Sequence, residues 1–325
     1  MTVGILGSGA WGTAIACVAA QNQASVTMWA REAHVVEEIN SRHSNETFLS
    51  GTTLPVSVRA TSDQSDLAGC NVIINATPTQ FVRSTFFDGL GEGAIVVNLA
   101  KGIERGTHLR VSEVIAHIAP SVASYVVLSG PSHAEEVVRN MPTTVVCAGR
   151  DREAVSIVQK LLMTPTFRVY ASDDVVGVEI GGALKNVIAI AAGIVDGLGL
   201  GDNTKAALIT RGLAEISRLG VALGADPQTL YGLAGLGDLF VTCTSRHSRN
   251  RAVGERIGRG ETLDQILESM SAVAEGVPTT QAALELAAAV GVELPITERV
   301  AAILWHGADP DESVRRLMMR PARDE

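Results

Sequence analysis

Lysine is scarce in this chain, and one lysine stands where it could transfer a proton. Lysine and arginine together number 26, and only four of them are lysine: Lys101, Lys160, Lys185 and Lys205. A lysine ammonium is compact and can lose its proton, whereas an arginine guanidinium keeps its charge. Lys185 lies in the largely apolar stretch 183–190, where burial would lower the pKa of its ammonium toward acid–base chemistry. The alternative is a lysine whose stem follows a buried helix to water.

The densest basic segment of the chain is Arg246-His247-Ser248-Arg249-Asn250-Arg251. The formal net charge is −9, which opposes binding to nucleic acid and to anionic membranes. In such an acidic chain, a local basic segment favours a small phosphate-bearing ligand, because arginine forks match phosphate oxygens and Ser248 and Asn250 add hydrogen bonds. A solvated helix face is the alternative. Contact with nucleic acid is disfavoured, since no second basic patch accompanies the segment.

A glycine pattern near the N-terminus predicts a dinucleotide-binding turn. Gly7-Ser8-Gly9-Ala10-Trp11-Gly12 fits G-x-G-x-x-G, follows an apolar strand-like run and opens a helix-like one. Gly7 permits the tight turn, Gly9 lets the backbone approach a pyrophosphate, and Gly12 allows close packing of helix on strand. Ser8, Ala10 and Trp11 would contribute mainly backbone contacts. An ordinary glycine-rich turn is the alternative.

Two charged residues, Arg31 and Glu32, follow the second predicted strand, where the adenosine ribose of a dinucleotide would lie. Arg31 could pair with the 2′-phosphate of NADP and stack on adenine, whereas Glu32 could meet the bare ribose of NAD. Both could also belong to a solvated helix start. We expect NADP as the cofactor, or the use of both NADP and NAD.

The elements that must position these residues change character partway along the chain. Short apolar runs predict strands at 3–6, 25–29, 72–75, 94–98, 125–128, 144–148 and 167–170, alternating with helices such as 13–21, 107–118 and 152–162. Continuous apolar strands are covered on both faces, so this order predicts a doubly wound parallel α/β sheet of the Rossmann type. Beyond it we expect helices alone, at 175–198, 204–219, 251–257, 263–270, 279–290, 297–306 and 310–319. The predicted domains are an NAD(P)-binding domain at 1–172 and an all-α domain at 173–325.

Composition limits the class of protein further. The chain has 325 residues, 46% hydrophobic and 19% charged, enough to bury two cores. Cys17, Cys70, Cys147 and Cys243 form no Cys-x-x-Cys pair, so we expect core thiols without a disulfide framework or a metal site, as suits a reducing cytoplasm. The chain enters a strand at once with no basic leader, and its longest apolar run, 187–195, is too short to cross a bilayer.

Five further segments carry a resemblance to a known family. They are Leu99-Ala100-Lys101-Gly102-Ile103-Glu104, Leu128-Ser129-Gly130-Pro131-Ser132-His133-Ala134, Gly181-Gly182-Ala183-Leu184-Lys185-Asn186-Val187, Gly235-Leu236-Gly237-Asp238-Leu239 and Ser248-Arg249-Asn250-Arg251. With the glycine pattern, they resemble in order the bacterial NAD(P)-dependent sn-glycerol-3-phosphate dehydrogenases. The resemblance implies hydride exchange between a nicotinamide and the C2 carbon of glycerol phosphate. It also implies reduction of dihydroxyacetone phosphate as the physiological direction and phospholipid synthesis as the use of the product.

The resemblance assigns roles to individual residues. It makes Lys185 the proton donor, places Asp238 beside it, and gives Lys101 contacts with both cofactor and substrate. Substrate contacts are implied for Lys101, Gly130, Ser132, Lys185, Asn186, Asp238, Thr242, Ser248, Arg249 and Asn250. Cofactor contacts are implied for Gly7, Ser8, Gly9, Ala10, Trp11, Gly12, Arg31, Lys101, Ala134, Arg249 and Glu275. Without the resemblance, Lys101 would be a loop lysine, Ser132 and Asp238 helix caps, and Glu275 an exposed acid.

Two other functions fit the same layout. A hydroxyacid or sugar-phosphate dehydrogenase shares the plan of a Rossmann domain followed by helices, and fold does not fix substrate. A non-catalytic NAD(P)-binding sensor needs the glycine pattern but no donor lysine. We expect a small-molecule substrate as the partner, with no nucleic acid and no membrane insertion; a homodimer is implied by the resemblance alone.

Overall fold

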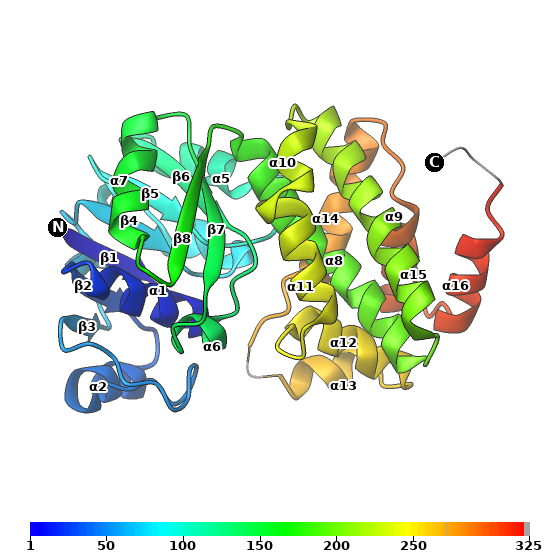
Figure 1. Cartoon of the computed structure of the whole chain (residues 1–325), viewed down its shortest axis with the longest axis horizontal. Coiled ribbons are helices and arrows are strands. Elements are labelled where there is room, and N and C mark those ends of the chain that lie inside the picture. The colour runs from blue at the N-terminus through cyan, green and yellow to red at the C-terminus, as the bar shows by residue number, and fades with distance from the viewer. Residues whose placement is uncertain (271, 322–325) are drawn as a thin grey trace. The chain divides into compact units, whose positions relative to one another are not determined.

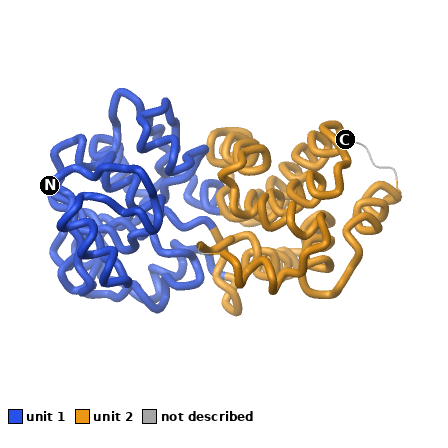
Figure 2. Tube along the Cα trace, turned by 90° about the horizontal axis from the view of Figure 1, so that it is seen from below, with its two compact units in different colours: residues 1–101, 109–179 blue, residues 102–108, 180–325 orange. Residues whose placement is uncertain are grey.

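The chain forms two compact units in the computed structural model, which describes residues 1–270 and 272–321. Unit 1 comprises Met1–Lys101 and Leu109–Glu179, and unit 2 comprises Gly102–His108 and Ile180–Glu325 (Figure 2). Helix α8 (Val175–Gly197) begins in unit 1 and runs on into unit 2. The change of pattern expected after residue 172 coincides with the end of strand β8 (Phe167–Ser172), just before this helix.

Unit 1 is built on one eight-stranded sheet with the order β3-β2-β1-β4-β5-β6-β7-β8 (Figure 1). Its other strands are β1 (Thr2–Leu6), β2 (Ser25–Trp29), β3 (Val58–Thr61), β4 (Val72–Asn75), β5 (Ile95–Asn98), β6 (Ser124–Ser129) and β7 (Thr143–Ala148). All neighbouring strands are parallel except β6 and β7. The predicted doubly wound α/β class is confirmed. The strand order reverses between β1 and β4, and ligands of such sheets bind beyond the carboxyl ends at that point.

Helices cover both faces of this sheet. One core contains buried residues of α1 (Ala10–Gln21), α2 (Ala33–Arg42) and α7 (Arg152–Leu162). The other contains buried residues of α3 (Val82–Thr85), α4 (Asp88–Gly91) and α5 (Val111–Ile118). Every residue of β4 is buried, which explains why the strand is an uninterrupted apolar run closed by an asparagine.

Three features of unit 1 differ from the sequence prediction. Strand β3 was missed, because this short edge strand buries only alternate residues and has no apolar run. Strand β7 runs antiparallel to β6, although an apolar run carries no information on strand direction. The helix expected at 107–118 begins only at Val111, because His108 has a φ of 60°, a left-handed conformation that interrupts a right-handed helix.

Unit 2 is helical, as predicted, and no strand occurs among its described residues. After α8 come α9 (Gly201–Ala222), α10 (Pro227–Tyr231), η3 (Leu233–Gly237), α11 (Asp238–Thr244), α12 (Arg249–Gly258), α13 (Leu263–Glu268), α14 (Gly276–Ala289), α15 (Pro295–Trp305) and α16 (Pro310–Met318). By length and composition α8 could cross a membrane, but its apolar window is wholly buried inside the protein, as in a core helix.

Candidate active site

The glycine pattern forms the turn between β1 and α1. Gly7 has a φ of 117°, which side chains rarely adopt. A Cβ on Gly12 would overlap the carbonyl oxygen of Gly7, so the helix can approach the turn only because this position has no side chain. At Gly9, by contrast, an added Cβ would meet nothing within 4 Å. The fold itself therefore requires glycine at positions 7 and 12, whereas glycine at position 9 leaves open space over the turn.

The donors at this turn fit the phosphates of a dinucleotide. The first intrahelical bond of α1 runs from Thr13 N to Gly9 O at 2.9 Å. The amides of residues 10–12 therefore lack helical acceptors, and they lie where the helix dipole favours an anion. In addition, the indole Nε1 of Trp11 is buried and bonds to no residue in the described part of the chain. The turn thus offers several donors and an uncrowded approach.

Asn45 supports the turn from outside the glycine pattern. Its fully buried side chain donates to Ser8 O at 2.8 Å and to Thr13 Oγ1 at 2.9 Å. The Thr13 hydroxyl in turn donates to Ser8 O at 3.1 Å. These bonds fix the backbone of Ser8 from behind. Sequence reasoning missed Asn45, because 37 positions separate it from Ser8 and no local pattern joins the two.

Arg31 and Glu32, which the sequence treated as alternatives, pair with each other. The Arg31 side chain is 80% exposed, and its Nε and NH2 groups donate to Glu32 Oε1 at 3.0 and 2.7 Å. An exposed ion pair of this kind contributes about 0–1 kcal/mol. A 2′-phosphate could therefore replace Glu32 as the partner of Arg31 at small cost.

Three predicted substrate residues of unit 1 meet at one carbonyl group. Lys101 Nζ donates to Gly130 O at 3.1 Å, and Ser132 Oγ donates to the same oxygen at 2.8 Å. Gly130 directly follows β6 with a φ of 136°. Ser132 is not a helix cap, because His133 is the N-cap of α6 (Ala134–Val137), with the predicted cofactor residue Ala134 at its first position.

Two buried asparagines link the carboxyl ends of β4 and β5. Asn75 Nδ2 donates to Asn98 Oδ1 at 2.8 Å, and Thr77 Oγ1 donates to Asn75 Oδ1 at 2.7 Å. Asn98 Nδ2 also donates to Ala100 O at 3.1 Å, which fixes the turn that carries Lys101. Sequence reasoning missed this pair. The available signal was an asparagine at the end of each of two apolar strands.

Unit 2 holds the buried ammonium that the sequence analysis singled out. Lys185 lies in α8, and its side chain is 7% exposed, so its stem does not carry the charge to water. Its Nζ donates to Asp238 Oδ1 at 2.6 Å and to Thr242 Oγ1 at 2.8 Å. The Asp238 carboxylate, 2% exposed, compensates the buried positive charge. Lys185, Asp238 and Thr242, predicted as one group, therefore lie together.

Glycines allow α11 to bring Asp238 to this position. A Cβ on Gly181 of α8 would lie 2.7 Å from Ala234 O, and a Cβ on Gly235 would overlap Leu230 O. The π-helical turn η3 therefore packs directly against α8 and leads without a break into α11. Asp238 is the first residue of α11 and not its N-cap, so the helix-cap alternative was wrong. A π-helical turn beside a functional group is a recurrent arrangement.

The basic segment forms the N-terminal end of α12. Ser248 is the N-cap, and its Oγ accepts from Arg251 N at 3.2 Å. Arg249 is exposed, whereas Asn250 is buried. Asn250 Nδ2 donates to Asn186 Oδ1 at 2.9 Å, and Asn250 Oδ1 accepts from Gly276 N at 2.9 Å.

The asparagine bonds join three predicted sites. They connect the helix of Lys185, the basic segment, and the start of α14, where Glu275 is the N-cap residue. They also leave the Asn250 side chain one amide hydrogen for a ligand. The predicted substrate and cofactor residues of unit 2 therefore form one connected group.

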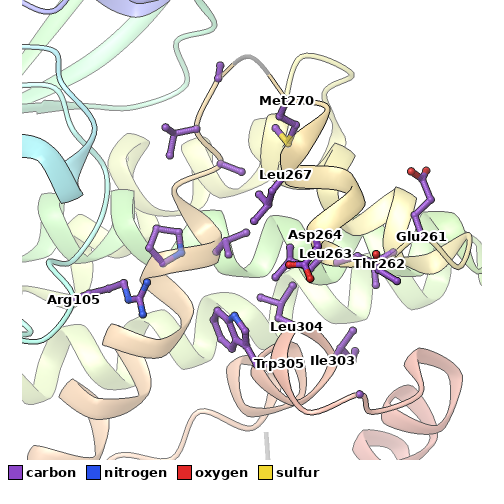
Figure 3. Close-up of a pocket in the computed structure, with 17 residues that line it drawn as sticks. Arg105, Glu261, Thr262, Leu263, Asp264, Leu267, Met270, Ile303, Leu304 and Trp305 are labelled. Carbon is purple, nitrogen blue, oxygen red and sulfur yellow. The ribbon is translucent and has the colours of Figure 1, made fainter.

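A separate cavity of about 870 Å³ lies in unit 2 among α12, α13, α14 and α15 (Figure 3). Its wall is mainly apolar, with Leu263, Leu304 and Trp305 among its residues, and it also includes Arg105 and Asp264. None of its lining residues belongs to the predicted catalytic, substrate or cofactor sets. We therefore place the chemistry at the lysine cluster rather than at this cavity.

A sheet with a glycine turn at its switch point, followed by a helical unit with a buried lysine, defines a dinucleotide-dependent dehydrogenase with two units. Residues 2–155 match the family model for the N-terminus of NAD-dependent glycerol-3-phosphate dehydrogenase, and residues 174–315 match the model for its C-terminus. The chain belongs to this family of oxidoreductases.

Individual relatives agree with the family models over the whole chain. The glycerol-3-phosphate dehydrogenase [NAD(P)+] of Geobacillus kaustophilus is 50% identical, over 99% of this chain and 96% of that protein. The enzyme of the same name from Geobacillus thermodenitrificans is 51% identical, over 99% and 95% of the two chains. The crystal structure of glycerol-3-phosphate dehydrogenase from Coxiella burnetii has a TM-score of 0.91 and 36% identity, and covers 98% of this chain and 99% of that chain.

These comparisons confirm the predicted family, fold class and type of cofactor. The preference between NADP and NAD, the domain limits and the roles of individual residues stay predictions. No cluster of three or more His, Cys, Asp or Glu side chains with the spacing of a metal site occurs within residues 1–270 and 272–321. Cys17, Cys147 and Cys243 are buried free thiols, and Cys70 is a half-buried one.

Proposed function

We propose that this chain reduces dihydroxyacetone phosphate to sn-glycerol 3-phosphate with NADPH or NADH. The observation that carries the proposal is the bonding of Lys185 to Asp238 and Thr242 inside unit 2. A buried, oriented ammonium is a proton donor matched to a carbonyl substrate. The names of the relatives at about half identity support the choice of substrate over other dehydrogenase substrates.

Reduction of a ketone needs a proton for the oxygen and stabilisation of the charge that develops there. The nicotinamide supplies the hydride when it is bound. Lys185 holds the proton on Nζ and gives it to the substrate oxygen, so that the ketone becomes an alcohol. Asp238 and Thr242 orient the ammonium. In the reverse direction the neutral Lys185 amine takes the hydroxyl proton back.

The substrate phosphate is held by the N-terminal end of α12. The exposed Arg249 supplies a guanidinium fork, and Ser248 and Asn250 supply their remaining hydrogens and the helix amides. Lys101, Gly130 and Ser132, which meet at one carbonyl, make further contacts with the substrate. Asn186 acts through its bond to Asn250.

The cofactor is held by the glycine turn and by a few side chains. Gly7, Ser8, Gly9, Ala10, Trp11 and Gly12 form the turn over which the pyrophosphate lies, and the amides of residues 10–12, which have no helical acceptor, donate to it. Arg31 pairs with the 2′-phosphate when NADP is the cofactor. Ala134, Glu275, Lys101 and Arg249 complete the contacts.

Steady-state assays test the proposed reaction directly. NADPH and NADH oxidation should be fast with dihydroxyacetone phosphate, and NADP reduction should be negligible with 3-hydroxyacids and 6-phosphogluconate. Activity on the last two substrates but not on the first would contradict the proposal. Cofactor binding with no turnover of any substrate would favour a non-catalytic sensor.

Three further features of the enzyme can be proposed: its compartment, the use of its product and its assembly. We propose that the enzyme works in the cytoplasm, because its four cysteines are free thiols, as is usual in a reducing compartment. Its product would feed glycerophospholipid synthesis. A homodimer is the proposed assembly, and light scattering coupled to size-exclusion chromatography would test it.

A further inference from the structure

The backbones of helices α8 and α12 meet at several glycines in unit 2. A Cβ on Gly193 would overlap Arg251 O, and a Cβ on Gly254 would overlap Ile190 O. One turn further on, the backbones meet again, since a Cβ on Gly258 would lie 2.7 Å from Ile194 O.

The contacts repeat every four residues in both helices. Asn186 bonds Asn250, the Ile190 carbonyl faces Gly254, and the Ile194 carbonyl faces Gly258. Both partners advance by four at each step, so the two helices run parallel in a fixed register. The helix with the proton donor and the helix with the predicted phosphate site are thus a single packed pair.

An ion network ties the same two helices together beside the glycine contacts. Asp196 of α8 accepts from Arg251 Nε at 2.7 Å, lies 2.6 Å from Arg251 NH2, and lies 2.6 Å from Lys205 Nζ. Arg251 NH1 also lies 3.2 Å from Glu255 Oε2. The side chains of Asp196, Lys205 and Arg251 are each less than one-fifth exposed, so solvent screens this network less than a surface pair.

The ion network around Asp196 gives Arg249 and Arg251, at the start of α12, different roles. Arg251 is committed to carboxylates on two sides and is not available to a phosphate. Arg249, two positions earlier, is exposed, and its side chain forms no hydrogen bond or ion pair with residues 1–270 or 272–321. The backbone amide of Arg251 also donates to the capping hydroxyl of Ser248. Holding Arg251 in place therefore holds the first turn of the helix in place.

We propose that Asp196, held by Lys205, is a positioning residue for phosphate recognition: through Arg251 it sets the first turn of α12 that presents Ser248, Arg249 and Asn250. The identity of the substrate in this proposal rests on the proposed function. The site itself can be tested with inorganic phosphate alone. It also gives Lys205, a lysine with no role in the sequence analysis, a specific task.

The test compares Asp196→Asn with Glu261→Gln, which removes an arginine–carboxylate pair near the other end of α12. Asp196→Asn should raise the KM for dihydroxyacetone phosphate, and the calorimetric Kd for inorganic phosphate, by about tenfold, the size expected for a charged hydrogen bond. The kcat should change by less than about twofold, because Lys185 keeps its bonds to Asp238 and Thr242. Glu261→Gln should leave all three values unchanged.

A double-mutant cycle separates positioning from a general loss of stability. Arg251→Gln should raise the phosphate Kd as much as Asp196→Asn, and the double variant should raise it no further, because both act through one contact. Additive effects, or a lowered melting temperature with unchanged phosphate Kd, would overturn the proposal. Should Asp196→Asn not fold, Lys205→Gln carries the same test with a smaller increase, about threefold. A wild-type protein that binds phosphate but does not reduce dihydroxyacetone phosphate would contradict the proposed function and leave this inference standing.

Discussion

The glycine turn of unit 1 and the lysine cluster of unit 2 are built in opposite ways. The turn offers backbone amides. Gly7 and Gly12 are needed there because a side chain at either position would collide with neighbouring backbone. The cluster offers side-chain atoms from two helices, because Asp238 and Thr242 of α11 lie 53 and 57 positions along the chain from Lys185 of α8. A backbone-built site tolerates many side chains but few changes of glycine. A side-chain-built site depends on the identity of each group.

The largest effect should come from Lys185→Ala in the side-chain site. Loss of the proton donor should lower kcat for dihydroxyacetone phosphate by about 10³-fold, the usual scale of general acid catalysis. The Kd for NADPH, measured by fluorescence titration, should stay within about twofold, since the cofactor residues remain. Lys160→Ala, at an exposed lysine of α7, is the control and should keep full activity. A Lys185→Ala enzyme with more than one-tenth of normal kcat would break the comparison.

A second buried carboxyl group in unit 2 is held mainly by backbone donors, and it forms no ion pair with residues 1–270 or 272–321. Glu215 of α9 accepts from Ile296 N at 2.6 Å and from Thr297 N at 3.3 Å, at the start of α15. Burial raises the pKa of this carboxyl from 4.5 to about 7, despite those bonds. Between these two pKa values the folded protein binds more protons than the unfolded chain, so its free energy of unfolding falls as pH rises.

Urea denaturation between pH 4.5 and 8 checks this effect. Glu215 alone should lower the free energy of unfolding by about 3 kcal/mol from the bottom to the top of the window, with no further loss above it. Glu215→Gln should lose this part of the slope. Glu298→Gln, at an exposed carboxylate in the first turn of α15, should keep it. Equal slopes in wild type and Glu215→Gln would contradict the assignment.

Within the backbone-built site, two glycines should respond differently to alanine. Gly12→Ala pushes a Cβ into the Gly7 carbonyl and should lower the free energy of unfolding by about 1–3 kcal/mol, as overpacking does. Gly9→Ala meets open space in the protein, so it should leave stability unchanged and weaken NADPH binding. Thermal denaturation and fluorescence titration of both variants measure the contrast. Equal losses of stability would show that Gly9 also serves the fold.

The smallest effect should come from the exposed pair at the end of β2. Glu32→Gln frees Arg31 from its partner and should raise the ratio of kcat/KM for NADPH over NADH by about two- to fivefold. Glu37→Gln, an exposed position on the same helix α2, is the matched control. A ratio that falls instead would mean that Glu32 does not compete for Arg31.

The sequence predicted much of the fold because burial leaves a local trace. Buried strands such as β4 are apolar runs, and the end of β8 coincides with the change to helices. Strand β3 left no such trace, because it is short, lies at the edge and is half exposed. The direction of β7 is set by packing and not by composition.

The site was predictable where a motif gathers its residues and not where the fold brings distant ones together. Lys185 and Arg249 stand in recognisable segments. Asn45 and Asp196 do not, since their partners lie tens of positions away. The ion pair between Lys205 and Asp196 was likewise not predicted from the sequence and is evident only in the structure.

Rescue of Lys185→Ala by added methylamine tests the central claim most directly. If the ammonium of Lys185 delivers the proton, turnover of dihydroxyacetone phosphate should rise with amine concentration and saturate, while the Kd for NADPH stays constant. Lys160→Ala should show no dependence on amine. A Lys185→Ala enzyme that binds NADPH normally, yet gains no activity from any small primary amine that enters the cavity left by the side chain, would contradict the account.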